Sequence, residues 1–137
     1  MRVYCDTCIY IDALDLNPEG SRDRIRPLSD LAWSFFSRVE EGKYVLVTSD
    51  WVFEEFKQVI GSDEKIRALV DAIKNKVNIT RTQEDIREAR KLSQKNFPDA
   101  LHVILAKKAG AFILTTRNLN DFAEFSDLIE ISLPESL

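Results

Sequence analysis

The residues best suited to chemistry in this sequence are acidic side chains beside short apolar segments. Asp6 directly follows the apolar segment 3–5, and Asp99 stands in the first turn of a strongly apolar predicted helix. Glu54 and Glu55 lie in a helix that follows a second apolar segment. Carboxylates about 5 Å apart repel one another by roughly 3 kcal/mol per pair at an effective dielectric near 20, so a cluster stays charged only beside a cation. Hard oxygen ligands of this kind select Mg²⁺ or Mn²⁺.

A fourth polar region follows the apolar segment 112–114 and contains Asn118 and Asp121. Taken singly, these acids have structural explanations, because Asp6 can cap the next helical turn and Asp99 can complement a helix dipole. If all of these acids lie at the same edge of a sheet, capping and helix-dipole effects do not explain why they lie together. The sequence therefore predicts a shared metal site.

The elements that must position these acids alternate between strand and helix. Strands are predicted at 3–5, 44–47, 77–80, 112–114 and 128–131, and helices at 7–14, 51–60, 63–76, 83–95 and 98–109, with another helix capped by Ser29 or Asp30 and ended by Gly42. This alternation predicts an α/β fold: a three-layer α/β/α domain spanning 1–137, with a mostly parallel central sheet. Ligands bind beyond the carboxyl ends of the strands in such sheets.

Glycine and histidine usage excludes other kinds of site. Only four glycines occur, at 20, 42, 61 and 110, and the last three are predicted to end helices. No glycine-rich loop is present to wrap phosphates, which argues against a Rossmann or P-loop site. Metal-free ribonucleases need two acid–base groups, most often histidines, and this chain has one, His102.

Composition and charge indicate an ordinary globular domain. The 137 residues are 45% hydrophobic and 31% charged, without an apolar run near the roughly 20 residues that a membrane span needs. No signal peptide is predicted, so we expect a cytoplasmic protein without a membrane. The net charge of −4 argues against broad electrostatic binding of nucleic acid. Arg22, Arg24 and Arg26 form a basic cluster that either holds phosphates locally or is a solvated surface.

Four motifs, in order along almost the whole chain, resemble PIN-domain ribonucleases, and most closely the small VapC-like toxins of toxin–antitoxin pairs. They are Val3-Tyr4-Cys5-Asp6-Thr7, the segment from Ser49 to Glu55-Phe56, Pro98-Asp99-Ala100-Leu101-His102, and Leu114-Thr115-Thr116-Arg117-Asn118 with Asp121-Phe122. The resemblance implies a PIN-like fold and a ribonuclease that depends on Mg²⁺ or Mn²⁺. It departs from the family at Cys8, where Asn or Ser is common, and at Asn118, where many members have an acid.

The resemblance also implies roles for individual residues. Asp6, Asp99 and a glutamate of the 51–60 helix would be metal ligands and catalytic residues; Glu55 fits better than Glu54 because an apolar residue follows it. Asp121 or the Asn118 amide would complete the site, around one or two ions. Metal-activated water would then attack phosphorus in line and leave 5′-phosphate and 3′-hydroxyl ends. Thr116 and Arg117 would help to hold the scissile phosphate.

The partners implied by the resemblance are an RNA substrate, an antitoxin protein lying across the acidic cleft, and a second copy of the chain in a homodimer, through the helices at 63–95. A free-standing RNA-processing nuclease is an alternative to a toxin. A PIN-like module that has lost catalysis and only binds RNA or protein is another, because of Asn118.

A thiol oxidoreductase is the rival from a different chemical class, because Cys5 and Cys8 form a C-x-x-C. Such a site needs an exposed first cysteine of low pKa, whereas Cys5 is predicted to end a buried strand and to point away from Asp6. His102 is predicted to pack near the site or to form hydrogen bonds within it rather than to bind metal. Trp51, Phe53 and Phe56 have the helical spacing of core residues rather than of a base-stacking surface.

Overall fold

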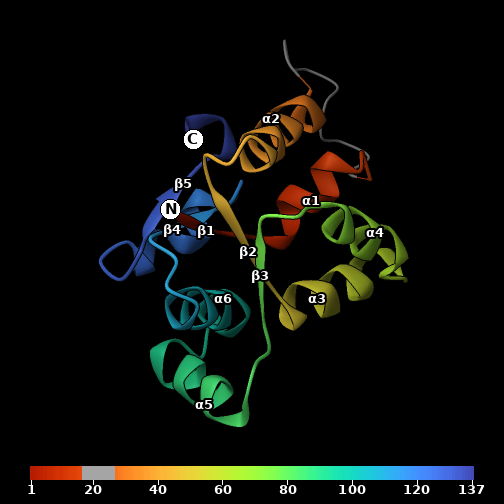
Figure 1. Cartoon of the computed structure of the whole chain (residues 1–137). Helices are drawn as coiled ribbons and strands as arrows, with labels where there is room; N and C mark the ends of the chain where they lie inside the picture. Colours follow the sequence, from red (N-terminus) through yellow and green to blue (C-terminus); the bar gives the residue numbers. More distant parts are fainter. Residues whose placement is uncertain (17–26) are drawn as a thin grey trace.

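The centre of the computed structural model, which describes residues 1–16 and 27–137, is a five-stranded parallel sheet (Figure 1). Its strands are β1 (Arg2–Cys5), β2 (Val45–Ser49), β3 (Lys76–Ile79), β4 (Ile113–Thr115) and β5 (Glu130–Ser132). They lie in the order β3-β2-β1-β4-β5, and every neighbouring pair is parallel. All five carboxyl ends therefore lie at one edge of the sheet.

Helices cover both faces of this sheet. One group consists of α1 (Thr7–Ala13), α2 (Leu28–Glu40), α3 (Asp50–Ile60) and α4 (Glu64–Ala72), while α5 (Gln83–Leu92) and α6 (Phe97–Lys108) pack together on the other side (Figure 1). Three short elements complete the described chain: α7 (Leu119–Phe122), η1 (Ala123–Phe125) and η2 (Pro134–Ser136). The predicted three-layer α/β/α architecture is confirmed.

The direction of the strand order reverses around β1. The chain first adds β2 and β3 on one side of β1, and then crosses over through α5 and α6 to add β4 and β5 on the other. A reversal of this kind opens a crevice beyond the carboxyl ends of the central strands. The central strands β1, β2 and β4 form the buried core of the sheet: Val3, Tyr4, Leu46, Val47 and Leu114 have no exposed surface. Because these strands are packed in the core, the residues that directly follow β1, β2 and β4 have fixed positions.

The ends of α3 show how local sequence fixes one wall of this crevice. Ser49 is the N-cap, and its Oγ accepts a hydrogen bond from the Val52 N–H at 3.3 Å. Gly61 ends the helix with a φ of 97°, a left-handed conformation that glycine adopts without strain. Gly42 and Gly110 follow α2 and α6 with positive φ as well. The prediction that these three glycines end helices is confirmed.

Some predicted boundaries were wrong. Pro27, not Ser29 or Asp30, is the N-cap of α2, and no side chain caps this helix. The helix predicted over 63–76 ends at Ala72, because Ile73 is buried in an extended conformation and leads the chain into β3. Further boundaries also differ: α5 ends at Leu92, β5 covers 130–132 rather than 128–131, and a short helix, α7, begins in the polar region after β4.

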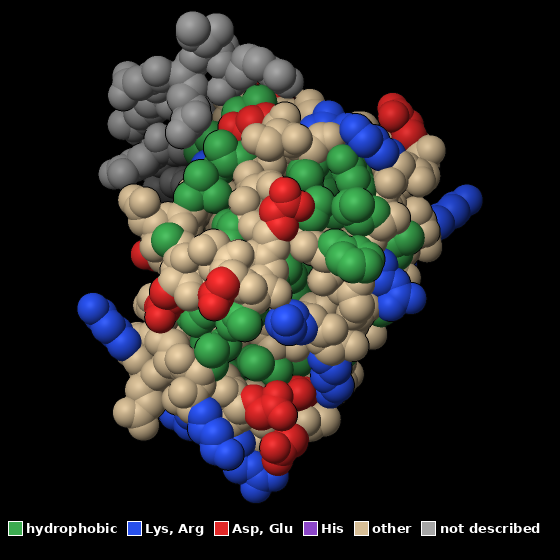
Figure 2. Space-filling view, turned by 90° about the vertical axis from the view of Figure 1, so that its left-hand side faces the viewer, with side chains coloured by type: hydrophobic (Ala, Val, Ile, Leu, Met, Phe, Trp, Pro, Cys, Tyr) green, Lys and Arg blue, Asp and Glu red, His purple; other side chains and the backbone are tan. Residues whose placement is uncertain are grey.

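The surface carries mixed charge. Figure 2 shows one face on which Asp and Glu side chains alternate with Lys and Arg side chains around hydrophobic patches. Arg22, Arg24 and Arg26, the predicted basic cluster, lie outside the described residues. Within the described ranges, none of the helices is long and apolar enough to cross a bilayer.

Candidate metal-binding and catalytic site

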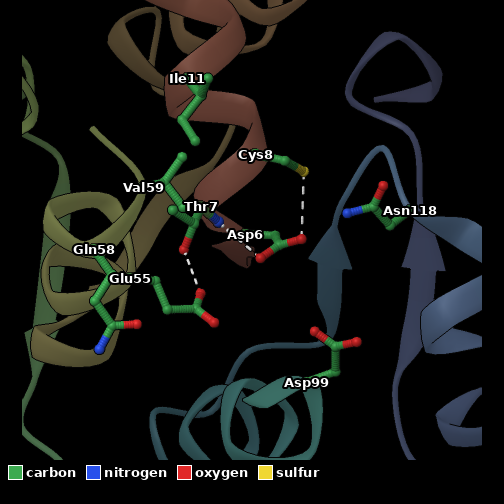
Figure 3. Close-up of a pocket in the computed structure, with 9 residues that line it drawn as sticks. All are labelled: Asp6, Thr7, Cys8, Ile11, Glu55, Gln58, Val59, Asp99 and Asn118. Carbon is green, nitrogen blue, oxygen red and sulfur yellow. Dashed lines mark hydrogen bonds between the residues drawn. The ribbon is translucent and has the colours of Figure 1, made fainter. Parts of the chain in front are cut away.

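A pocket of about 240 Å³ opens at the carboxyl edge of the sheet, beyond β1 (Figure 3). Four of the predicted site residues line it together: Asp6 after β1, Glu55 on α3, Asp99 on α6 and Asn118 after β4. The remaining lining residues are Thr7, Cys8, Ile11, Gln58 and Val59. Side chains that are distant in sequence therefore meet at the strand-order reversal.

Asp6 is held by hydrogen bonds on both carboxylate oxygens. As the N-cap of α1, it accepts the Thr7 N–H on Oδ1 at 2.8 Å. Its Oδ2 accepts the Thr116 hydroxyl at 2.7 Å and the Cys8 thiol at 3.3 Å. The residue is 5% exposed, so these donors fix its orientation. The structural explanation for Asp6, helix capping, thus holds together with its place in the pocket.

Glu55, rather than Glu54, faces the pocket. Its Oε1 accepts the Thr7 hydroxyl at 2.7 Å and lies 2.6 Å from Nε2 of His102. Glu54 instead accepts a long hydrogen bond from the Gln58 amide at 3.5 Å. Burial raises the pKa of the Glu55 carboxyl, but the charge and hydrogen bond of His102 and the Thr7 hydroxyl outweigh burial and lower it. Glu55 is therefore ionised at neutral pH.

His102 lies behind the pocket with no exposed surface. Its Nδ1 is 2.7 Å from the Tyr4 hydroxyl, and its Nε2 is also 3.5 Å from Oδ1 of Asp6. Burial lowers the pKa of the imidazole, but Glu55, Asp6 and Asp99 raise it above its usual value. The prediction that His102 forms hydrogen bonds within the site is confirmed. Atoms of Asp6, Glu55 and His102 lie within 4.8 Å of one another, close enough to be considered together as ligands.

Asp99 is a pocket acid with a raised pKa. Burial and the charge of Asp6 raise its pKa, His102 lowers it, and Glu55 and Asp121 raise it further, to about 7. A divalent cation beside this carboxyl would offset the repulsion and favour its ionised form.

The turn after β4 brings Asn118 and Asp121 to different positions. Asn118 lines the main pocket, and its backbone N–H donates to Oγ1 of Thr116 at 3.0 Å. Asp121 is exposed and lines a neighbouring hollow, although its charge still acts on Asp99. Asn118 is therefore the better placed of the two to complete the pocket.

Thr116 and Arg117, predicted to hold phosphate, have other partners. The Thr116 hydroxyl is fully buried and donates to Asp6. The Arg117 guanidinium pairs with Glu135 at 2.7 Å and lies 3.8 Å from Asp12. These contacts give Thr116 the role of orienting Asp6, and they direct the charge of Arg117 toward the carboxyl-terminal part of the chain.

The two cysteines do not form a redox centre in this structure. Both are free thiols, Cys5 is buried, and burial followed by the charge of Asp6 raises both pKa values well above the usual range. Nucleophilic thiols need the opposite shift. The C-x-x-C is therefore part of the strand and helix that position Asp6.

Sequence reasoning missed three hydroxyl groups that organise the site. The Thr7 hydroxyl donates to Glu55, while its backbone N–H donates to Asp6. The Tyr4 hydroxyl contacts both His102 and Oγ of Ser49, each at 2.7 Å. One signal was available, since Tyr4 stands two residues before Asp6 and alternate residues of a strand share a face.

The donors present fit a hard divalent cation. Carboxylates of Asp6, Glu55 and Asp99 and the Asn118 amide line one pocket, and burial followed by the charge of Asp6 raises the pKa of Asp99. Oxygen donors of this kind suit Mg²⁺ or Mn²⁺.

Comparison with known proteins supports the fold. No protein-family model and no curated protein matches the sequence. A chain in the crystal structure of VapBC2 from Rickettsia felis, bound to a DNA fragment from its promoter, aligns with a TM-score of 0.63 over 96% of this chain and 98% of that chain, at 16% identity. VapC20 of Mycobacterium tuberculosis, a Sarcin-Ricin loop cleaving toxin, aligns with a TM-score of 0.61 over 88% of this chain and 93% of that chain, also at 16% identity. The chain thus has the PIN-like fold of VapC structures, as predicted.

Proposed function

We propose that this chain is a divalent-metal-dependent endoribonuclease, a VapC-like toxin whose residues 1–137 act as one PIN-like domain. One observation carries the proposal: the acidic groups of Asp6, Glu55 and Asp99 and the amide of Asn118 converge in one pocket. The pocket lies where ligands bind in an open parallel sheet. The fold shared with VapC structures supports the same assignment.

Asp6, Glu55, Asp99 and Asn118 would hold Mg²⁺ or Mn²⁺, with Asp121 as an outer acid. The bound ion supplies a Lewis acid that activates water and stabilises charge on the oxygens of the phosphodiester. The chain itself contributes orientation, because Thr7 and Thr116 hold the carboxylates of Glu55 and Asp6 with hydrogen bonds of 2.7 Å. Pre-oriented ligands lower the reorganisation needed during reaction.

The proposed partners are RNA, an antitoxin and a second copy of the chain. VapC20 is described as a Sarcin-Ricin loop cleaving toxin, and the VapBC2 structure as bound to a DNA fragment from its promoter. The fold shared with these structures favours a toxin over a free-standing RNA-processing nuclease. An antitoxin would lie across the acidic pocket. Homodimerisation through the region from α4 to α5 is the corresponding proposal for self-association.

The function is tested by RNA cleavage with Mg²⁺ or Mn²⁺ and with EDTA, with analysis of the product ends. Asp6→Asn and Glu55→Gln should each lower cleavage by more than about 100-fold, because each removes a charge that holds the ion. Glu54→Gln, one residue away and outside the pocket lining, is the matched control and should stay within about twofold of wild type. Products should carry 5′-phosphate and 3′-hydroxyl ends.

Two outcomes of the cleavage assay would contradict the proposed function. If the wild-type protein and Asp6→Asn degrade RNA equally poorly, the chain is a binding module and not a nuclease. If EDTA leaves full activity, the reaction does not use the proposed metal.

A further inference from the structure

His102 is an unusual residue for its position. It lies on α6, whose neighbouring residues Leu101 and Val103 are apolar and buried, and it has no exposed surface. Burying an imidazole is costly unless its nitrogens form hydrogen bonds. Here both nitrogens have partners, Tyr4 on one side and Glu55 on the other. Packing alone would be served by an aliphatic side chain, so the hydrogen bonds explain the histidine.

The direction of these hydrogen bonds follows from the Glu55 carboxylate. A carboxylate only accepts, so Nε2 of His102 carries a proton and donates to Oε1. In a neutral imidazole Nδ1 then accepts, and the Tyr4 hydroxyl donates to it. Because the hydroxyl proton of Tyr4 is then donated to Nδ1, the Tyr4 oxygen can only accept a hydrogen bond from the Ser49 hydroxyl. A second proton on Nδ1 would reverse the outer two bonds and leave the bond to Glu55 unchanged.

This chain of hydrogen bonds joins every element that brings an acid to the pocket. Tyr4 is on β1 two residues before Asp6, and Ser49 is the N-cap of α3, the helix of Glu55. His102 is three residues after Asp99 on α6, so both lie on one side of that helix. The network therefore fixes Glu55 relative to both Asp6 and Asp99.

Both donors reach the same oxygen of Glu55. Thr7 and His102 donate to Oε1, while the second oxygen is turned toward the centre of the pocket (Figure 3). A side chain on a helix surface is thereby held in one orientation, with one oxygen used by the protein and the other directed at the position of a ligand.

We infer that His102 is a positioning residue, which, with Tyr4 and Ser49 behind it, presents one oxygen of Glu55 to the metal. The inference rests on the proposed function, because it assigns a role toward the ion that the pocket would hold. His102 itself stays behind Glu55 and does not touch the substrate. Partners of this kind behind metal ligands typically change metal affinity by 10- to 100-fold when removed.

Two substitutions of His102 separate positioning from packing. The amide nitrogen of Gln can take the position of Nε2, whereas that of Asn reaches only the position of Nδ1. We expect His102→Asn to raise the Kd for Mn²⁺ by about 10- to 100-fold, and His102→Gln to recover a large part of that loss. Mn²⁺ binding is measured by electron paramagnetic resonance of the free ion, and thermal unfolding without metal reports the fold.

Tyr4→Phe tests the same inference with His102 in place. Without the Tyr4 hydroxyl, the imidazole proton can move to Nδ1, and Nε2 then no longer donates to Glu55. Glu55 is held less firmly, so the Kd for Mn²⁺ should rise, although by less than in His102→Asn. Tyr44→Phe is the matched control, because the Tyr44 hydroxyl donates to the Leu137 carbonyl at 3.0 Å and does not line the pocket. It should leave Mn²⁺ binding unchanged.

The outcomes distinguish this inference from the proposed function. If wild type binds no Mn²⁺, the proposed function fails first. If wild type binds Mn²⁺ and cleaves RNA, but His102→Asn binds it within twofold of wild type, His102 is a packing residue and the inference is wrong. It is also wrong if His102→Gln binds no better than His102→Asn. If His102→Asn does not fold, the Kd values of His102→Gln and Tyr4→Phe for Mn²⁺ test the inference instead.

Discussion

The two sides of the pocket hold their acids in different ways. On the side of β1 and α3, Asp6 and Glu55 accept hydrogen bonds from Thr7, Thr116 and His102 at 2.6 to 2.8 Å. On the side of α6, the influences on Asp99 are burial and neighbouring charge, with no hydrogen bond among them. On the side of β1 and α3, which we call the ordered side, hydrogen bonds within the protein orient both carboxylates without a bound ion.

This difference suggests that the two sides have different roles in binding the ion. The hydrogen bonds of Thr7 and His102, together with the charge of His102, favour the charged form of Glu55 without an ion. Asp99 remains half protonated near neutral pH, since its pKa is raised to about 7. The ordered side would thus recruit the ion, and Asp99 would complete its coordination once the ion is present.

Among variants that leave every acid in place, the largest effect is expected from removing a hydrogen bond on the side of β1 and α3. Thr116→Val removes the hydroxyl that donates to Asp6 and keeps the shape of the side chain, so Mn²⁺-dependent cleavage should fall by about 10- to 100-fold. Thr115→Val is the matched control, because the hydroxyl of Thr115 is buried without a hydrogen-bond partner among the described residues. Its activity should be unchanged and its stability equal or higher. Equal activity of both variants would show that Asp6 needs no such support.

The next effect concerns Asp99 and pH. Its folded-state pKa of about 7 exceeds the usual 3.8, so the folded protein binds this proton more tightly than the unfolded chain. The contribution of Asp99 to the free energy of unfolding of the metal-free protein therefore falls as pH rises from about 4 to about 7. Asp99→Asn removes this loss and should be more stable than wild type at pH 8 by about 1 kcal/mol, after discounting for partial exposure, and equal near pH 4.

Urea unfolding in EDTA at the two pH values measures that difference. Other titrating groups are present in both proteins, so the difference reports Asp99 together with its interaction with His102. A variant that is less stable than wild type at pH 8 would mean that Asp99 supports the fold rather than the metal site.

The smallest effect is expected at Cys8, whose thiol also donates to Asp6. A thiol is a weak donor, and its bond to Asp6 is long, at 3.3 Å. Cys8→Ala should therefore lower cleavage by less than about threefold, measured with the same RNA and Mn²⁺. A loss as large as that of Asp6→Asn would give the thiol a chemical role and revive the redox hypothesis.

Sequence alone predicted the features that depend on local pattern and motif. The alternation of strands and helices predicted the three layers. Asp6 was found as the acid after a strand and Asp99 as the acid in the first turn of an apolar helix, and the family resemblance selected Glu55 over Glu54. The end of α4 was missed because burial of Ile73 and pairing of β3 with β2 override helical periodicity. Such tertiary preferences leave no mark in the local sequence.

The hydrogen-bond network could not be predicted for the same reason. The bonds that link Tyr4 to Ser49 and His102 join residues 45 and 98 positions apart. Thr116 and Arg117 have types that suit phosphate binding, but which partner each one takes depends on how β4 pairs with β1 and on where η2 packs. Residue type gives the candidates, and three-dimensional neighbours decide among them.

The central claim is that Asp6 and Asp99, from opposite sides of the pocket, share one cation. Crystals soaked in Mn²⁺ and measured at the manganese absorption edge test it directly, because the anomalous signal locates the ion independently of the protein. We expect a peak in the pocket in contact with a carboxylate oxygen of each residue, at about 2.0–2.6 Å. A protein that takes up Mn²⁺ on only one of the two side chains, or at another position altogether, would contradict the claim.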